Sequence, residues 1–293
     1  MPEWYTITNM DEVDTPALVV YPDRVRHNIA LLVKLVKDVN RLRPHVKTNK
    51  TKHAALLMME AGITRFKCAT IAEAEMLAEA GAPDVLLAYQ PVGPKIERFI
   101  SLIQKYPSVK FSCLVDNIGS SKAIDARASA AGIQIPVYLD LNVGMNRTGI
   151  IPDQKAVDLY IQCSNLKGIK PVGLHAYDGH ITDIELEVRE QKCGEAFAKV
   201  EWLQKEIRKG NQEQPLIVAG GTPSFPVHAK NAQVQCSPGT FIYWDAGYIQ
   251  KYKEQAFLPA ALVVSRIISL PDDSTICTDL GHKSVAAENP LSN

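Results

Sequence analysis

The feature that most constrains this chain is a repeated alternation of short β-rich segments with longer amphipathic segments. Several of the amphipathic segments end at a glycine, such as Gly62 and Gly81, as helices commonly do. About eight such pairs follow residue 42, and eight pairs over roughly 200–250 residues predict a (β/α)8 TIM-type barrel of class α/β. The β-rich segments are RPHVKT, RFKCAT, DVLLAY, VKFSCLV, IPVYLDLNV, IKPVGLHAY, QPLIVAGG and AQVQCSPG.

An open doubly wound sheet is the alternative fold for such an alternation. It usually has fewer strands and a GxGxxG turn after the first strand, and the chain contains no GxGxxG. We therefore expect the barrel, over residues 23–250.

Two further parts flank the barrel in this interpretation. Residues 1–22 contribute an N-terminal strand, and residues 251–293 begin a C-terminal β domain that the same strand joins. Because few strands follow residue 250, we expect this β-rich domain, built from both chain ends, to be incomplete in this chain.

Composition excludes some classes of function. The chain has 293 residues, with Lys plus Arg equal to Asp plus Glu at 32 each, so no basic excess points to nucleic acid or to a membrane surface. No apolar run reaches the roughly 18 residues of a bilayer span, and the acidic start is not a signal peptide. The six cysteines form no CxxC pair, which indicates a reducing, cytoplasmic setting without structural zinc.

In a barrel, function resides at the carboxyl ends of the strands and in the loops that follow. Lys47 ends the first β-rich segment, where desolvation would lower the pKa of its amine and let it attack a carbonyl. A solvated basic turn is the alternative, because Lys50 and Lys52 follow closely.

Two later loops carry polar groups. After the fifth strand, Arg147 lies in a loop with Asn142, Asn146 and Gly149, where it offers a planar cation to an anion, or is a simple surface arginine. After the sixth strand, four groups that ionise or form hydrogen bonds cluster, which favours function over a satisfied core histidine. They are His175, Tyr177, Asp178 and His180.

The loops after the seventh and eighth strands predict an anion site. Gly221 and Thr222, with Ser224, open a short helical segment, and Gly239 and Thr240 follow the last strand. Backbone N–H groups and hydroxyls at these two positions are where barrels bind phosphate. Two ordinary βα turns are the alternative.

These groups together fit one ligand. It carries a phosphate for the two glycine turns, an aldehyde for Lys47, and an oxyanion or ring near Arg147 and His175. Pyridoxal 5'-phosphate has each of these features.

The same segments resemble those of a known family. DTPALVVYPDRVRHNI, RPHVKTNK, CATIAEAEMLAEAG, NVGMNRTGI, GLHAYDGHI, AGGTPSF and QCSPGTFIYWDAGY are similar to segments of the fold-type III pyridoxal-phosphate enzymes, the alanine-racemase-like barrels. Within that group, the chain looks most like the D-threonine aldolase and D-serine dehydratase family, over residues 14 to about 285.

The resemblance implies roles for individual residues. Lys47 would form the Schiff base with the cofactor, Arg147 would contact the phenolic oxygen and His175 would sit beside the pyridine ring. The turns Gly221–Thr222 and Gly239–Thr240 would hold the phosphate. Weaker correspondences add residues to the edge of the site: Tyr177, Asp178, Asp245 and Tyr248.

The chain departs from the family in two places. The family commonly has His where this chain has Asn49. Its members also bind a divalent metal such as manganese through a His-x-Asp or His-x-Cys pair near the C-terminus. In this chain no histidine is followed two residues later by Asp or Cys. We therefore expect no metal ligands in this chain.

The resemblance implies a pyridoxal-phosphate carbon–carbon lyase that cleaves D-β-hydroxy amino acids, as in D-threonine to glycine and acetaldehyde. A D-serine dehydratase or an amino-acid racemase on the same scaffold, a non-catalytic pyridoxal-phosphate-binding protein, and an aldolase that uses Lys47 directly are the alternatives. The expected partners are a small D-amino acid and, from the resemblance, a second copy in a homodimer.

Overall fold

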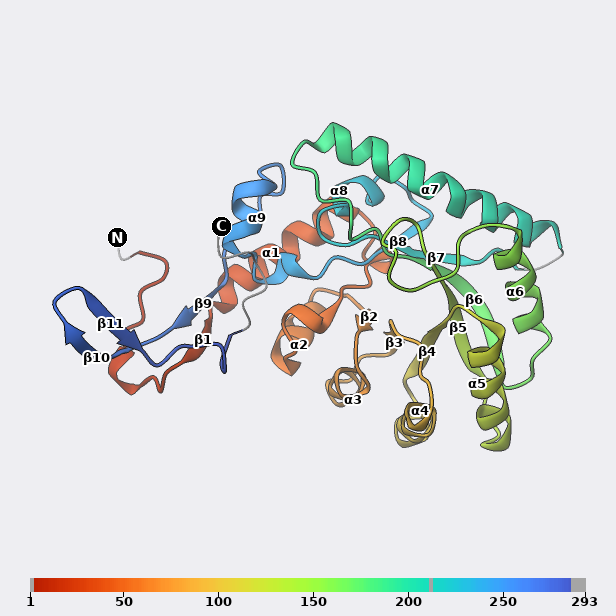
Figure 1. Cartoon of the computed structure of the whole chain (residues 1–293), viewed down its shortest axis with the longest axis horizontal. Helices are drawn as coiled ribbons and strands as arrows, with labels where there is room; N and C mark the ends of the chain where they lie inside the picture. The colour runs from red at the N-terminus through yellow and green to blue at the C-terminus, as the bar shows by residue number, and fades with distance from the viewer. Residues whose placement is uncertain (1–2, 211–212, 286–293) are drawn as a thin grey trace.

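The computed structural model describes residues 3–210 and 213–285, and its centre is a seven-stranded parallel sheet (Figure 1). Each strand pairs with the next one along the chain, whereas a doubly wound sheet reverses its order at a switch point. The predicted parallel alternation is therefore confirmed and the open doubly wound alternative is not. The strands are β2 (Arg65–Cys68), β3 (Asp84–Leu87), β4 (Lys110–Val115), β5 (Ile135–Leu141), β6 (Ile169–Ala176), β7 (Leu216–Ala219) and β8 (Val234–Cys236).

Helices connect the strands and flank the curved sheet (Figure 1). Many begin where a short polar side chain accepts a hydrogen bond from a first-turn N–H, as Thr51, Thr70 and Asn117 do. The α-helices are α1 (Pro22–Val36), α2 (Lys52–Glu60), α3 (Ile71–Glu79), α4 (Pro94–Lys105), α5 (Ile118–Ala130), α6 (Gln154–Ser164), α7 (Leu186–Lys209), α8 (Phe225–His228) and α9 (Ala246–Lys251), and the 3-10 helices are η1 (Met10–Glu12), η2 (Val39–Arg41), η3 (Val46–Thr48) and η4 (Thr240–Ile242).

The first expected barrel strand is not a regular strand, which corrects the prediction of eight. Residues 42–45 instead bridge both edges of the sheet: the Arg43 N–H donates to Cys236 of β8, and the Pro44 carbonyl accepts from Lys67 of β2. Pro44 has no N–H, so a ladder toward β2 cannot continue. The chain then turns into η3, which places Lys47 in a 3-10 turn.

The strands divide their side chains between two cores. The larger core lies between the sheet and its helices, and a small cluster fills the inside of the curved sheet. That inner cluster consists of Leu86, Leu114, Tyr138 and Val218. Because side chains alternate along a strand, Lys67, Asp140 and His175, which lie between members of the outer core, face the same interior.

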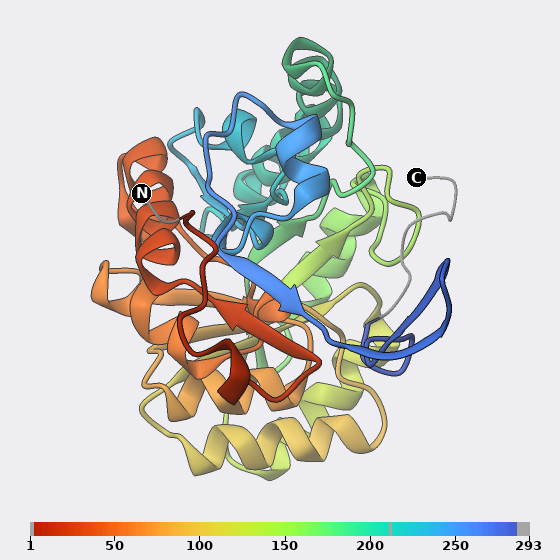
Figure 2. The ribbon, with the colours of Figure 1, turned by 90° about the vertical axis from the view of Figure 1, so that its left-hand side faces the viewer.

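Both chain ends contribute to small antiparallel sheets beside the barrel (Figures 1 and 2). Strand β1 (Ala17–Val20) pairs with β9 (Ala261–Val264), and β10 (Ile267–Asp272) forms a hairpin with β11 (Thr275–Thr278). In Figure 1 the hairpin projects away from the helices. The expected β-rich part is therefore present, whereas residues 286–293 at its end lie outside the described residues.

Two sequence expectations concern the environment of the protein. Within residues 3–210 and 213–285, every helix is too short or too polar to span a bilayer. All six cysteines are free, and five of them are buried.

The segment after residue 241 is tied to the first long helix. Asn28 of α1 is fully buried; its Nδ2 donates to the carbonyls of Ile242 (3.3 Å) and Leu258 (2.7 Å), and its Oδ1 accepts from the Leu258 N–H at 2.8 Å. Tyr252 and Phe257 belong to the same outer core as α1. One side chain therefore fixes the chain's end against its beginning.

We predict that Asn28→Ala destabilises the fold by about 1–3 kcal/mol, because it leaves buried backbone groups without partners. Urea unfolding followed by circular dichroism measures the change. His27→Ala, one residue away on the exposed side of α1, is the control and is expected to stay within about 0.5 kcal/mol of the parent. Equal effects of the two substitutions would show that the Asn28 bonds contribute nothing specific.

Candidate functional site

Three cations surround one aromatic ring at the carboxyl ends of the strands. The ring is that of Tyr177, which directly follows β6. The amines of Lys47 and Lys67 each lie 5.6 Å from its centroid, and the Arg147 guanidinium carbon lies at 5.4 Å. The structure thus brings the predicted Lys47, Arg147 and Tyr177 together and adds Lys67.

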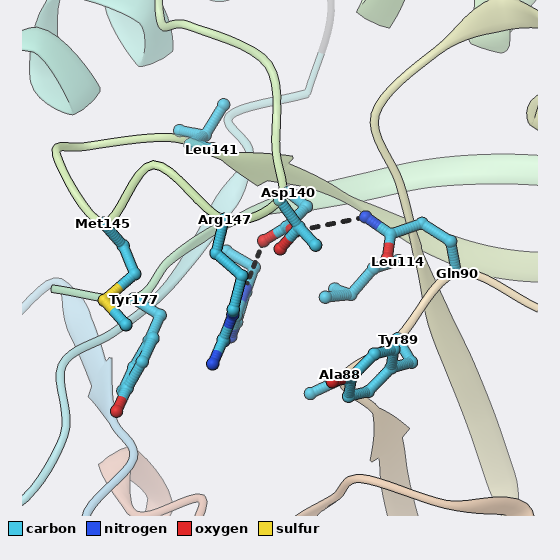
Figure 3. Close-up of a pocket in the computed structure, with 11 residues that line it drawn as sticks. Ala88, Tyr89, Gln90, Leu114, Asp140, Leu141, Met145, Arg147 and Tyr177 are labelled. Atoms are coloured by element: carbon cyan, nitrogen blue, oxygen red, sulfur yellow. Dashed lines mark hydrogen bonds and ion pairs between the residues drawn. The ribbon is translucent and has the colours of Figure 1, made fainter. Parts of the chain in front are cut away.

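The loop that presents Arg147 is held by hydrogen bonds within the loop. The Asn142 carboxamide oxygen accepts the N–H groups of Gly144 and Asn146, each at 3.1 Å. Gly149 has a φ of 96°, and a Cβ there would lie 2.7 Å from the Asn142 nitrogen, so only glycine fits. The guanidinium is therefore offered from a defined turn, and Figure 3 shows it beside Tyr177 in the pocket.

His175 is fixed by a carboxylate behind it. Its Nδ1 lies 2.8 Å from Oδ1 of buried Asp140, whose other oxygen accepts from Gln90 at 3.1 Å (Figure 3). Burial and then nearby Lys67 lower the pKa of His175, while the pKa of Asp140 is held low by its bond to His175 despite its own burial. His175 is therefore neutral, with Nδ1–H donating to Asp140 and Nε2 left as an acceptor.

Lys67 is a site residue that the sequence analysis missed. Its side chain is 2% exposed, and its amine lies 3.4 Å from His175 Nε2. Burial, and next the positive charge of Lys47, lower its pKa to about 7. The alternation in RFKCAT was the available signal, since a lysine between outward-packed Phe66 and Cys68 must point into the barrel.

Lys47 itself differs from expectation in one respect. Its place after a β-rich segment predicts a desolvated amine, but its side chain is exposed in the structure. The reason is its position on η3, after the last residue that bridges to the sheet. The desolvated lysine of the site is Lys67.

The two glycine turns meet as predicted. The N–H groups of Gly239 and Thr240 donate to one atom, the hydroxyl oxygen of Thr222, at 3.1 and 3.0 Å. A Cβ on Gly239 would come 3.0 Å from the His45 carbonyl oxygen, and one on Gly221 would come 3.2 Å from the Tyr177 ring. Two N–H groups thus converge on the Thr222 oxygen, and the two glycines keep the surrounding space from becoming crowded next to Tyr177.

Asp178 is hydrogen-bonded to side chains that hold the loop after β7. Buried in the barrel wall, its carboxylate accepts from the Ser224 hydroxyl at 2.7 Å and lies 2.6 Å from His228 Nε2. The hydrogen bonds to His228 and Ser224 hold the pKa of Asp178 low although burial acts against them. Ser224 in turn accepts the Gly221 N–H at 3.1 Å. Asp178 therefore positions the glycine turn rather than facing a ligand.

The expectation that metal ligands are absent has to be corrected. Asp178, Cys193 and His228, all buried, place their ligand atoms within 4.8 Å of one another and could hold a metal ion. They come from the end of β6, from α7 and from α8, so no short motif reveals them. The three already bond to one another, with the Cys193 thiol 3.7 Å from the Asp178 carboxylate and its pKa raised to about 12 by burial.

The remaining predicted residues lie at the margin. Asp245 is exposed and caps α9 by accepting the Tyr248 N–H at 3.0 Å. The Tyr248 hydroxyl bonds to Thr240, and burial raises its pKa. Asn49 is buried, and its side chain accepts from the Thr51 N–H, a local turn contact. His180 packs against Gly144, where a Cβ would lie 2.4 Å from its Nε2.

Several known proteins are similar to this chain in sequence. Residues 20–246 match the family model "Alanine racemase, N-terminal domain". Over 281 residues the chain is 28% identical to a D-threonine aldolase from Arthrobacter sp., covering 94% of this chain and 74% of that protein. It is 24% identical to a D-threo-3-hydroxyaspartate dehydratase from Delftia sp. (strain HT23), covering 80% of this chain and 62% of the relative.

Solved structures agree on the fold. The crystal structure of a D-threonine aldolase from Filomicrobium marinum superposes with a TM-score of 0.86 at 28% identity, over 94% of this chain and 75% of that one. An alanine racemase of Clostridium difficile 630 superposes with a TM-score of 0.73 at 14% identity, over 89% of this chain and 71% of that one. The chain therefore spans about three quarters or less of these relatives.

We predict that Asp178→Ala lowers the free energy of unfolding by about 3–5 kcal/mol, because His228, Ser224 and Cys193 lose a buried partner together. Chemical denaturation measures the loss. Asp183→Ala removes a carboxylate that pairs with Lys192 at the surface and serves as control, with a much smaller effect expected. A stability of the Asp178 variant equal to that of the control would contradict the positioning role.

Proposed function

The chain belongs to the alanine racemase N-terminal domain family, and from this premise we propose that it is a pyridoxal-phosphate enzyme that cleaves D-β-hydroxy amino acids in the manner of a D-threonine aldolase. The observation that carries the proposal is the arrangement around Tyr177. An amine and a guanidinium lie over a single aromatic ring, and the Gly221–Thr222 turn, to which Gly239 and Thr240 are hydrogen-bonded, lies next to it.

The residues present fit pyridoxal phosphate. A phosphate oxygen requires a hydrogen-bond donor, and the Thr222 hydroxyl, whose oxygen accepts the N–H groups of Gly239 and Thr240, has its own hydrogen to donate. An aldehyde requires an accessible amine, and Lys47 is exposed. A planar ring requires an aromatic face, which Tyr177 supplies.

The chain's own residues would act as follows. Lys47 would hold the aldehyde, and the 239–240 turn would hold the phosphate. Arg147 would pair with an oxyanion beside Tyr177. His175, oriented by Asp140 and kept neutral by burial and by Lys67, would border the ring without adding a charge. When bound, the cofactor supplies an electron sink for the electron pair that remains at Cα when a bond to that carbon breaks.

The substrate class rests on the relatives and on the pocket. Both similar enzymes named for an activity on D-configured hydroxy amino acids cover at least 80% of this chain. The pocket next to the ring is lined by Gln90, Thr148 and Arg147, groups that bind hydroxyl and carboxylate oxygens. Figure 3 shows Tyr89 and Leu114 in the lining of the same pocket, where they present apolar surface.

We predict that borohydride reduction of the protein incubated with pyridoxal phosphate places a pyridoxyl group on Lys47. Peptide mapping by mass spectrometry identifies the modified lysine. Lys47→Ala should lose the label there, while Lys50→Ala, a neighbouring exposed lysine, should keep it. A pyridoxyl group mainly on Lys50, or none, would refute the assignment of the cofactor.

We predict that the loaded protein releases glycine and acetaldehyde from D-threonine and not from L-threonine. Amino-acid analysis and an aldehyde-coupled assay, each with and without added manganese, measure the products. Formation of 2-oxobutyrate would identify a dehydratase instead, and appearance of an epimer a racemase. Cofactor binding with no product from any D-amino acid would favour the non-catalytic binding protein.

A further inference from the structure

We propose that Lys67 is a second reactive amine of this site and that, with His175 and Asp140 behind it, it accepts the substrate's hydroxyl proton and returns it to Cα. The inference rests on the proposed function for the identity of the reacting atoms. The arrangement of the three side chains is a property of the chain itself.

Lys67 differs in its contacts from Arg43, a buried cation that stabilises the fold. Arg43, 1% exposed, is paired throughout: it bonds to both oxygens of Asp84 and to the side chain of Gln235. For Lys67, no ion pair occurs among the residues that the structure describes. Its amine has the imidazole of His175 at 3.4 Å and the Tyr177 ring as neighbours. A charged amine is poorly supported there, so the neutral form is available.

The hydrogen bonds of Asp140 and His175 determine which way the lone pair of the neutral Lys67 amine points. Asp140 accepts from His175 Nδ1, so His175 Nε2 must accept, and Lys67 donates one hydrogen to it. The lone pair of the amine then faces away from His175. The Tyr177 ring, with Lys47 and Arg147 around it, marks the space that substrate would occupy. Lys67 can therefore accept a proton from that space.

The proposed step balances. The Lys67 amine takes the proton of the β-hydroxyl and becomes an ammonium. The hydroxyl oxygen's electron pair forms the carbonyl at Cβ, the Cα–Cβ bond breaks, and its electron pair remains at Cα. Lys67 then gives the proton to Cα, so the amine is restored and glycine and an aldehyde are the only products.

The charged groups around Lys67 set the pH at which this is possible. Lys47 and Arg43 oppose its charge, Asp140 and Asp178 favour it, and His45 and His175, both with lowered pKa, stand beside it. The Tyr177 phenol has a raised pKa through burial and stays neutral. With burial added, the amine changes its charge near neutral pH, where proton transfer in both directions is fastest.

The first test needs no turnover. In protein without cofactor, labelled at lysine Cε with ¹³C, the resonance that disappears in Lys67→Met belongs to Lys67. We expect it to titrate with a midpoint near 7, while exposed lysines titrate near 10.4. A midpoint above 9 would overturn the proposal whatever the enzyme's reaction is.

The second test measures the proton transfer itself. Lys67→Met should reduce glycine formation from D-threonine by about 10²–10⁴-fold, while the pyridoxyl label on Lys47 stays. Lys67→Ala should be rescued by added ethylamine in proportion to its neutral fraction. Lys110→Met, on an exposed lysine of β4, is the control and should leave the rate unchanged.

The outcomes separate the two proposals. Rescue by amine together with a midpoint near 7 supports the role of Lys67. Full activity of Lys67→Met, or recovery with Lys67→Arg but not with ethylamine, shows a structural charge and overturns it. If the parent protein makes no glycine but the Lys67 amine still titrates near 7, the aldolase assignment fails while the amine retains its acid–base character.

Discussion

The site depends on the way in which residues 42–45 join the two edges of the parallel sheet. The Arg43 N–H reaches β8 and the Pro44 carbonyl reaches β2, so one short segment fixes the distance between strands at opposite ends of the sheet. The turn η3 follows at once and carries Lys47. The same segment supports the Gly239–Thr240 turn, because the His45 carbonyl limits the space at Gly239. Residues 42–45, which do not form a regular strand, thus position the Lys47 amine and the Gly239–Thr240 turn relative to each other.

More positive than negative charge faces the Tyr177 ring at the mouth of the barrel. Lys47, Lys67 and Arg147 surround the Tyr177 ring, while the two nearby carboxylates, Asp140 and Asp178, are bound to histidines and face away from it. The local field therefore favours an anion, as a phosphate or a carboxylate would require. Lys67 is the most deeply buried of these three cations, and burial together with the charge of Lys47 lowers its pKa.

The sequence predicted much of this arrangement, for identifiable reasons. Parallel strands follow from the alternation, and the clustering of Lys47, Arg147, Tyr177 and the glycine turns follows from their place after strands. The sequence shows that Pro44 has no N–H group. Whether this interrupts a strand depends on which edge of the sheet the missing N–H would face, and only the fold determines that.

Other groups were beyond pattern analysis. The group of Asp178, Cys193 and His228 joins three elements far apart in the chain, so only the folded backbone brings it together. Lys67 lay in a predicted strand, yet its burial follows from the curvature of the sheet and from the inner cluster below it.

The Asn28 contacts have a consequence for the order of events during synthesis. Helix α1 leaves the ribosome before every strand of the parallel sheet, but its polar partners at Ile242 and Leu258 lie 214 and 230 residues later in the chain. Until that segment arrives, a carboxamide that ends fully buried has only water to bond with, and the apolar face of α1 lacks Tyr252 and Phe257. The flank of the barrel at α1 is therefore completed only after residues 242–258 have been synthesised, so pairing the strands in order from β2 to β8 does not by itself complete the fold.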